Sequence, residues 1–98
     1  MTIEKYINGT ELTIKMTGRL TTTTSPQFEA VLQESSVGMT TIILDFAELE
    51  YLSSSGLRVL LKTQKVMNKR GKLIIRNVNK TIEEIFTVTG FYNVFTVE

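Results

Sequence analysis

Apolar and polar residues alternate near the start of the chain and predict a β-hairpin. Between residues 12 and 16 every second side chain is apolar, which is the pattern of a strand with one buried face. A weaker partner strand is expected over residues 3–7. Asn8 and Gly9 between them tolerate the positive φ angles of a tight turn, and Gly18 is expected to end the hairpin.

Helical and strand patterns alternate along the rest of the chain. Right-handed β-α-β connections between them predict one α/β domain over residues 1–98, with a mixed sheet of four or five strands and about four helices. The expected elements are a helix capped by Ser25 and opened by Pro26, a strand at 41–46 buried on both faces, a helix from about 54 to 69 closed by Gly71, a strand at 72–76, a helix opened by a capping box at 81–84 and stopped by Gly90, and a short final strand or edge segment within 91–97.

Composition removes most catalytic chemistry. The 98 residues include no cysteine and no histidine. These absences exclude disulfides, thiolate nucleophiles, zinc–sulfur sites and a Ser-His-Asp triad within this chain. The six glycines are dispersed and form neither a GxGxxG motif nor a P-loop. We therefore expect no enzymatic activity, no catalytic residue, no metal site and no cofactor.

The overall charge and hydropathy favour a cytoplasmic protein. A formal net charge of +1 gives no general electrostatic reason to bind nucleic acid or an anionic membrane. No apolar run approaches the roughly 20 residues of a membrane span, so direct insertion is not expected. The first residues also lack the apolar core of a signal peptide.

Three consecutive serines, Ser53–Ser55, directly precede the helix expected from residue 54 and form the candidate site. Serines before a helix are most often plain N-caps, but free N–H groups and the helix dipole also favour a phosphate there. A phosphate on Ser54 would change the surface by about −1.5 to −2 charges and could meet Arg58 one turn later. Asp45 ends the preceding strand, where it either accepts hydrogen bonds from the serine turn or caps a turn of its own. The turn is thus a reversible switch or an ordinary helix cap.

Basic residues of the same predicted helix recur at positions that share one narrow face. This stripe could dock an acidic partner, or it could be an ordinary solvated face of an amphipathic helix. Its members are Arg58, Lys62, Lys65 and Lys69.

The chain resembles a stand-alone STAS domain, the module named for sulfate transporters and anti-sigma factor antagonists. A strand aspartate, a serine turn, a Gly-Leu pair and an apolar helix follow one another as in the family's signature. The segments that carry the likeness span nearly the whole chain and are Gly18-Arg19-Leu20, Ser25-Pro26-Gln27-Phe28-Glu29, Ile43-Leu44-Asp45-Phe46, residues 51–61, Gly71-Lys72-Leu73 and Thr89-Gly90-Phe91.

The resemblance implies an anti-anti-sigma factor. In that family the unphosphorylated domain binds an anti-sigma factor that is also a serine kinase. Phosphorylation releases the domain, and a serine phosphatase resets the cycle. The phosphoacceptor lies two positions before the signature glycine, which makes it Ser54. We expect a monomer whose partner-binding or site-supporting residues are Asp45, Ser53, Ser55, Gly56, Arg58 and Lys62.

Two positions depart from the family pattern, and a second function stays open. Ser53 stands where members often have aspartate, and Thr21 replaces the aspartate that many have after the first Gly-x-Leu. Both changes remove negative charge near the expected site. The alternative is a constitutive STAS subunit of a transport or stress-signalling complex, without a phosphorylation cycle. A neighbouring gene for a kinase-like ATPase would favour the first function, and an adjacent transporter operon the second.

Overall fold

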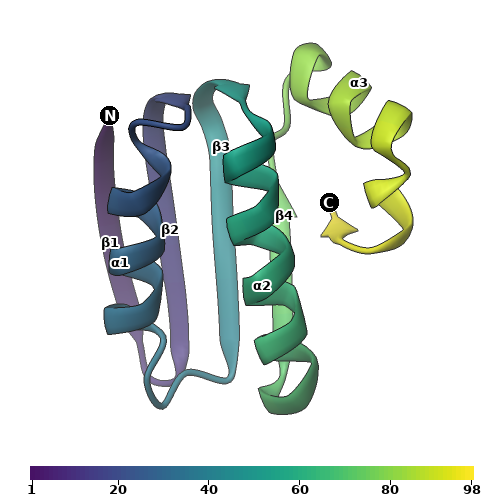
Figure 1. Cartoon of the computed structure of the whole chain (residues 1–98). Coiled ribbons are helices and arrows are strands. Elements are labelled where there is room, and N and C mark those ends of the chain that lie inside the picture. The colour runs from purple at the N-terminus through teal and green to yellow at the C-terminus, as the bar shows by residue number, and fades with distance from the viewer.

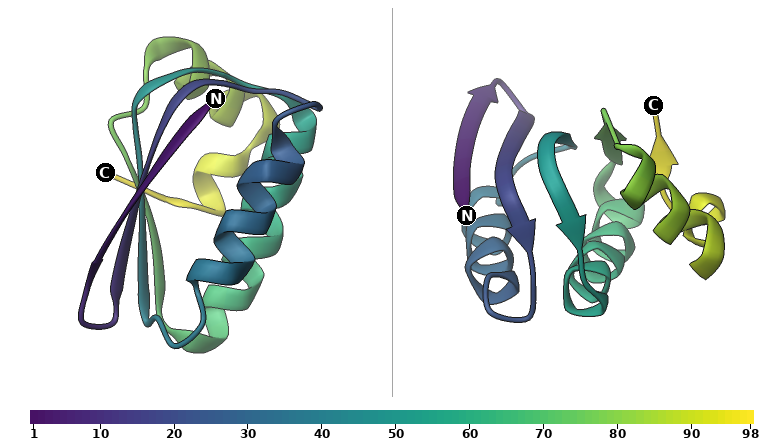
Figure 2. Two further views of the ribbon diagram at one scale, coloured as in Figure 1. Left: turned by 90° about the vertical axis from the view of Figure 1, so that its left-hand side faces the viewer. Right: turned by 90° about the horizontal axis from the view of Figure 1, so that it is seen from above.

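The computed structural model, which describes residues 1–98, has one five-stranded mixed sheet with its helices on one face (Figures 1 and 2). The strand order is β1-β2-β3-β4-β5, in which β1 is antiparallel to β2 and all later neighbours are parallel. The elements are β1 Thr2–Asn8, β2 Glu11–Leu20, α1 Ser25–Ser35, β3 Thr41–Leu52, α2 Ser54–Arg70, β4 Lys72–Arg76, α3 Lys80–Thr89, the 3-10 turn Phe91–Asn93 and β5 Thr96–Val97.

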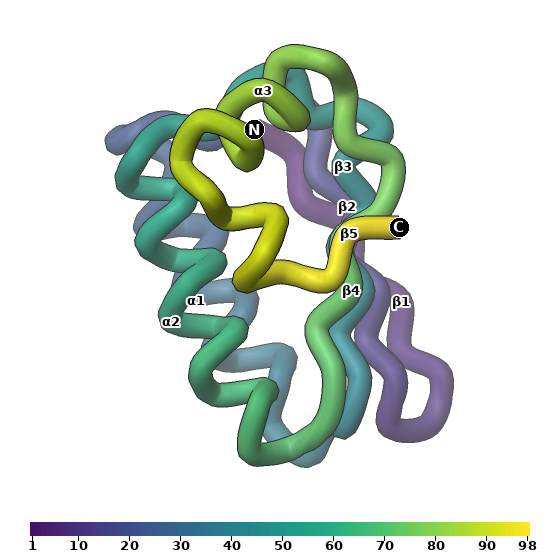
Figure 3. Tube along the Cα trace, turned by 90° about the vertical axis from the view of Figure 1, so that its right-hand side faces the viewer, coloured from purple at the N-terminus to yellow at the C-terminus, as the bar shows by residue number.

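The α/β architecture expected from the sequence is confirmed, with three α-helices and one 3-10 turn instead of about four helices. α1 and α2 run side by side, α1 against β2 and α2 against β3 and β4. α3 contacts β3 and leads back to β5; it lies at the upper right in Figure 1 and at the top in Figure 3. Fully buried Phe28, Phe46 and Phe86 fill the space between the sheet and the helices. No helix is long and apolar enough to cross a membrane.

The N-terminal hairpin forms with its turn one residue later than expected. Asn8 still pairs with Glu11 in the ladder, so Gly9 and Thr10 are the two central turn residues. Only Gly9 has a positive φ, +63°. β1 pairing ends just before Gly18, as expected, but β2 itself continues to Leu20 along β3.

β3 continues six residues beyond the predicted strand end at Phe46. Its pairing with β2 shifts register twice, and each shift leaves an extra residue on β3, one after Asp45 and one after Leu49. The inward-facing, buried positions are therefore Leu44, Phe46, Leu49 and Leu52, separated by two, three and three residues. Because simple alternation is lost, the second half of this strand does not resemble one in sequence.

Two helix caps differ from the predicted ones. α1 is preceded by Thr24, not Ser25, and its cap makes no side-chain hydrogen bond. α3 is capped by Asn79, whose Oδ1 accepts from the Ile82 N–H at 2.9 Å. The Asn79 amide also donates to the Leu49 carbonyl at 2.9 Å, so tertiary contact decides where α3 begins.

Gly71 ends α2, as expected, but for a different physical reason than a left-handed cap. Its φ of 166° is extended. A Cβ at this position would lie 1.8 Å from the Thr40 carbonyl oxygen, which already accepts a hydrogen bond from the Lys72 N–H at 3.0 Å. Glycine is required because the α2–β4 connection passes directly over the backbone that enters β3.

Candidate functional site

The serine turn lies where two parallel strands end, at the top of the sheet in Figure 1. The Ser53 N–H donates to the Leu20 carbonyl at 2.8 Å, which joins the end of β3 to the end of β2. Across the two connections, the hydroxyls of Thr22 and Ser55 lie 3.3 Å apart. Sites of open α/β sheets concentrate at such carboxyl ends, and the expected position of the serine turn is confirmed.

The three serines have different partners. Ser53 is the N-cap of α2, and its hydroxyl accepts from the Gly56 N–H at 3.3 Å. The Ser55 hydroxyl contacts Thr22. Ser54, the first residue of α2, is exposed, and its hydroxyl makes no hydrogen bond within the chain. The hydroxyl that is free for chemistry is therefore the one on Ser54.

Gly56 sets how closely the first turn of α2 approaches the sheet. A Cβ on Gly56 would lie 2.6 Å from Leu52 Cδ1 and 2.7 Å from Leu20 Cδ2. Both leucines are almost completely buried at the ends of β2 and β3. Because Gly56 has no side chain, the first turn of α2 can pack directly against these leucines, and this packing fixes the position of Ser54.

An open hollow of about 420 Å³ lies beside Ser54, between the start of α2 and α3. Five of its nine lining residues are apolar, and Val88 among them is 86% exposed. Its only charged residue is Glu84. The lining residues are Tyr51, Leu52, Ser54, Leu57, Thr81, Glu84, Ile85, Val88 and Thr89.

A polar hollow of about 200 Å³ lies on the opposite side of the turn, between α1 and α2. It is lined by Ser55, Arg58 and Lys62 together with Thr22. The structure therefore places Arg58 toward the α1 side and Ser54 toward the α3 side, although they are one turn apart. Arg58 is exposed and makes no hydrogen bond or ion pair within the chain.

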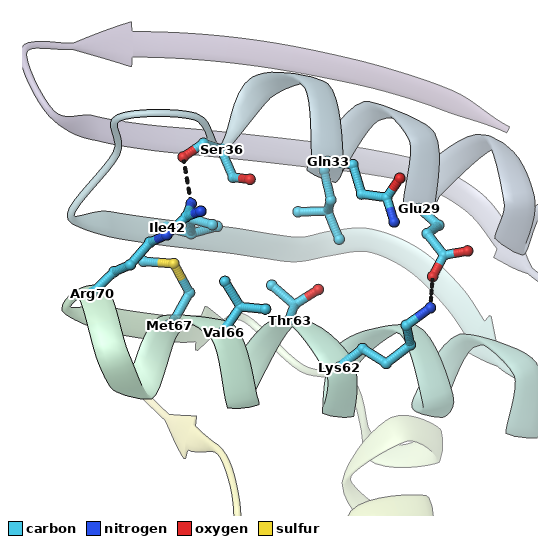
Figure 4. A pocket seen from close by; sticks show the side chains of 10 residues that line it. Glu29, Gln33, Ser36, Ile42, Lys62, Thr63, Val66, Met67 and Arg70 are labelled. Carbon is cyan, nitrogen blue, oxygen red and sulfur yellow. Dashed lines mark hydrogen bonds and ion pairs between the residues drawn. The ribbon is translucent and has the colours of Figure 1, made fainter.

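Farther along, the groove between α1 and α2 is bridged by polar contacts at both ends (Figure 4). The Lys62 ammonium meets the Glu29 carboxylate at 2.7 Å, and the Arg70 guanidinium donates to the Ser36 carbonyl at 3.3 Å. Between them lies a hollow of about 220 Å³. The expected basic stripe of α2 is exposed along its length.

Asp45 does not reach the serine turn, which corrects the sequence-based expectation. Its Oδ1 accepts from the Ala47 N–H at 3.0 Å and from the Asn77 side-chain amide at 2.9 Å. Six residues of β3 lie between Asp45 and Leu52, which is roughly 20 Å at the usual strand rise. The pKa of Asp45 is lowered, chiefly by the hydrogen bond from Asn77. Partial burial acts in the opposite direction and raises the pKa, but the Ala47 N–H and the charges of Lys15 and Arg76 lower it further.

Three residues near the turn were not singled out from the sequence: Thr22, Glu84 and Val88. From the sequence, the run Thr21–Thr24 is only a loop. In the structure β2 ends beside β3, and this brings the Thr22 hydroxyl next to Ser55. The positions of Glu84 and Val88 depend on how α3 packs over β3. No local pattern in the sequence indicates that packing.

Comparisons with a family model and with individual proteins identify the same family. The family model described as STAS domain matches residues 2–98. BtrV of Bordetella bronchiseptica, named as an anti-sigma factor antagonist, is 32% identical over 82 residues, covering 82% of this chain and 71% of BtrV. The anti-sigma-B factor antagonist of Staphylococcus epidermidis is 28% identical over 99 aligned positions, covering 99% of this chain and 92% of that protein.

The fold is also that of a solved anti-sigma factor antagonist, SpoIIAA of Bacillus. Its unphosphorylated form superposes with a TM-score of 0.84 at 21% identity, covering 99% of this chain and 88% of SpoIIAA. Its phosphorylated form superposes with a TM-score of 0.77, covering 99% of this chain and 91% of SpoIIAA.

Proposed function

The chain belongs to the STAS domain family, and because its relatives are anti-sigma factor antagonists, we propose that it is a phosphorylation-controlled binding module of that kind. In this proposal, unphosphorylated protein binds an anti-sigma factor with serine-kinase activity in the cytoplasm. The kinase transfers a phosphoryl group to Ser54, and binding is lost. A serine phosphatase restores the hydroxyl, and the module itself is a monomer with no catalytic role.

The observation that carries the proposal is the unequal use of the three serines. Ser53 is occupied as the cap of α2, and Ser55 contacts Thr22, whereas the Ser54 hydroxyl is exposed and unbonded. A kinase can reach Ser54 without breaking a contact that holds the fold. SpoIIAA, which shares the fold, is known in a phosphorylated form, in keeping with a switch of this type.

A phosphate on Ser54 would suit the fold but oppose a partner. The N-terminus of α2 presents free N–H groups and the positive end of its dipole, and Arg58 is unpaired one turn later. The same phosphate adds about −1.5 to −2 charges beside Glu84 and the apolar hollow between α2 and α3. A partner that packs on this hollow would have to desolvate the phosphate.

A pull-down with the candidate anti-sigma kinase, with and without ATP, tests the proposal. We expect Ser54→Ala to bind constitutively and Ser54→Asp to bind about 100-fold more weakly, which corresponds to about 2.7 kcal/mol. Ser53→Ala and Ser55→Ala are the matched controls, and both should still accept phosphate. Phosphosite mapping by mass spectrometry should place the phosphate on Ser54.

The result that overturns the switch is equal binding by Ser54→Ala and Ser54→Asp, with phosphate on Ser53 or nowhere. That outcome would favour a constitutive STAS subunit of a transport or stress-signalling complex. The two functions share the fold, so this experiment separates them where fold similarity does not.

A further inference from the structure

α2 has a charge distribution unlike the rest of the molecule. The 17-residue helix contains five basic residues and no acidic one. Of the eleven basic residues in the chain only six lie elsewhere, where they are outnumbered by all ten acidic residues. The near-neutral chain is therefore electrostatically divided, with positive charge concentrated on one helix.

Four of these basic side chains form a single line on the solvent side of α2, which we call the α2 ridge. Spacings of four, three and four residues place them opposite the buried face, and the helix extends about 25 Å. Only Lys62 has an acidic partner, Glu29 at 2.7 Å (Figure 4). The ridge consists of Arg58, Lys62, Lys65 and Lys69, all exposed.

The fold itself gains little from this arrangement. Exposed helices are normally stabilised when opposite charges are three or four residues apart, whereas like charges at those spacings are destabilising. Arg58 also lies near the N-terminus of α2, where the helix dipole disfavours a cation. Burial does not explain the ridge either, because its ammonium and guanidinium groups face solvent. The fold gives Lys62 an acidic partner and gives Lys69 the favourable C-terminal end of the helix dipole. It gives Arg58 and Lys65 neither, and these two cations remain available for binding.

We infer that the α2 ridge is an electrostatic docking surface for an acidic polypeptide segment of the anti-sigma partner, an inference that rests on the proposed function. The ridge begins one turn after Ser54, so acceptor and ridge form one continuous surface. Carboxylates spaced about 6 Å apart, one helical turn, would match successive ridge cations. The negative balance elsewhere on the chain would also steer such a segment toward α2.

The surroundings of the ridge favour a polypeptide over other polyanions. No aromatic side chain is present on α2 to stack with bases, and the remaining surface would repel an extended nucleic acid. Val66 is the one large apolar side chain of α2 that is clearly exposed, which is too little for insertion into a lipid interface.

The α2 ridge also explains how a phosphate would act beyond its immediate surroundings. Phosphorylated Ser54 lies four residues before Arg58 and can attract its guanidinium. The phosphate would then compete with a partner carboxylate for the first ridge cation. Phosphorylation would thus weaken the end of the docking surface nearest the acceptor and leave Lys65 and Lys69 unchanged.

The test uses the full unphosphorylated chain and a polyglutamate peptide, so it does not depend on identifying an anti-sigma factor. We expect NMR shift changes concentrated on α2, and affinity for the peptide that falls about tenfold in Lys65→Glu. Lys5→Glu on β1 is the matched control, since Lys5 is also exposed and the change in net charge is identical. The control should bind the peptide as the wild type does.

Three outcomes would overturn the docking surface. The first is NMR shift changes spread over the whole molecule, and the second is an equal loss of peptide affinity in Lys65→Glu and Lys5→Glu. The third is tighter binding of duplex DNA or phosphatidylserine vesicles than of the peptide. If Lys65→Glu also weakens binding to the candidate anti-sigma kinase while Ser54→Ala and Ser54→Asp bind it equally, the α2 ridge is upheld and the phosphorylation switch is wrong. If only the Ser54 variants differ, the switch is upheld and the ridge is wrong.

Discussion

Replacing Asp45 with alanine should destabilise the fold and leave partner binding intact. One carboxylate oxygen holds two separate pieces of backbone. It accepts the Ala47 N–H at the first register shift of β3, and it accepts the amide of Asn77, which has a φ of +62° just after β4. Asp45 therefore holds the irregular part of β3 against the end of β4.

The expected loss follows from these contacts. Hydrogen bonds to a charged group contribute about 1.5–3 kcal/mol when buried, but Asp45 is only half-buried and Ala47 is exposed, so water can replace part of them. Lys15 and Arg76 lie on either side of Asp45 in the sheet, and exposed pairs of this kind add about 0–1 kcal/mol. We expect Asp45→Ala to lower the free energy of unfolding by about 2 kcal/mol in total. In a domain of this size that lowers Tm by roughly 10 °C.

The pH dependence has a definite sign. The pKa of Asp45 is lowered in the folded protein, chiefly by the Asn77 hydrogen bond. Its contribution to stability is therefore complete above the unfolded pKa of about 3.9 and is lost as the pH falls through the lower, folded value. Wild-type stability should fall below about pH 4. Asp45→Asn, which keeps an acceptor oxygen, should lack this part of the decrease.

Urea unfolding followed by circular dichroism, at pH 7 and below pH 4, measures these effects, and partner affinity is measured well below Tm. Glu48→Ala is the matched control, because Glu48 is an exposed acid on the same strand without a side-chain hydrogen bond. An Asp45→Ala protein with wild-type stability but no partner binding would refute the structural role and would make Asp45 a residue of the binding site.

The remaining predictions concern the serine turn, the two close-packed glycines and the hollow. Ser53→Ala should lower the unfolding free energy by about 1 kcal/mol through loss of the α2 cap, whereas Ser54→Ala should change it by less than about 0.5 kcal/mol in the same urea titration. Gly71→Ala should be the more damaging glycine substitution, because backbone at Thr40 must move. Gly56→Ala should cost about 1–3 kcal/mol for displacing Leu20 and Leu52, partly offset by about 1 kcal/mol of helix propensity; equal Tm values for the two glycine variants would contradict this order. Val88→Asp should keep the wild-type Tm, since Val88 is 86% exposed, yet weaken anti-sigma binding; unchanged affinity would remove the hollow from the proposed interface.

The elements with strong local signals could be predicted from the sequence. The alternation over residues 12–16 identifies β2, and the serine turn identifies the start of α2 at Ser54. Both depend on residues within one or two turns of the chain, so no tertiary information is needed. The position of the candidate acceptor follows for the same reason, because it lies at a helix start.

The features that were missed depend on contacts between distant segments. The second half of β3 is a strand because β2 accompanies it through two register shifts, which erase the alternation that sequence analysis relies on. The misplacement of Asp45 follows directly, since the strand does not end beside it. Asn79 caps α3 with the help of the Leu49 carbonyl, 30 residues away. The pairing of Thr22 with Ser55 likewise spans 33 residues.

The length of β3 beyond β4 has a consequence for aggregation. β4 ends at Arg76, opposite Asp45, so β3 from Phe46 to Leu52 has no strand neighbour on that side. Such an open edge invites pairing with another chain. The Asn79 amide occupies the Leu49 carbonyl, and α3 covers this part of the edge. The C-terminal helix thus protects this edge from strand-to-strand pairing, and a chain from which α3 has been detached should aggregate more readily than the intact chain.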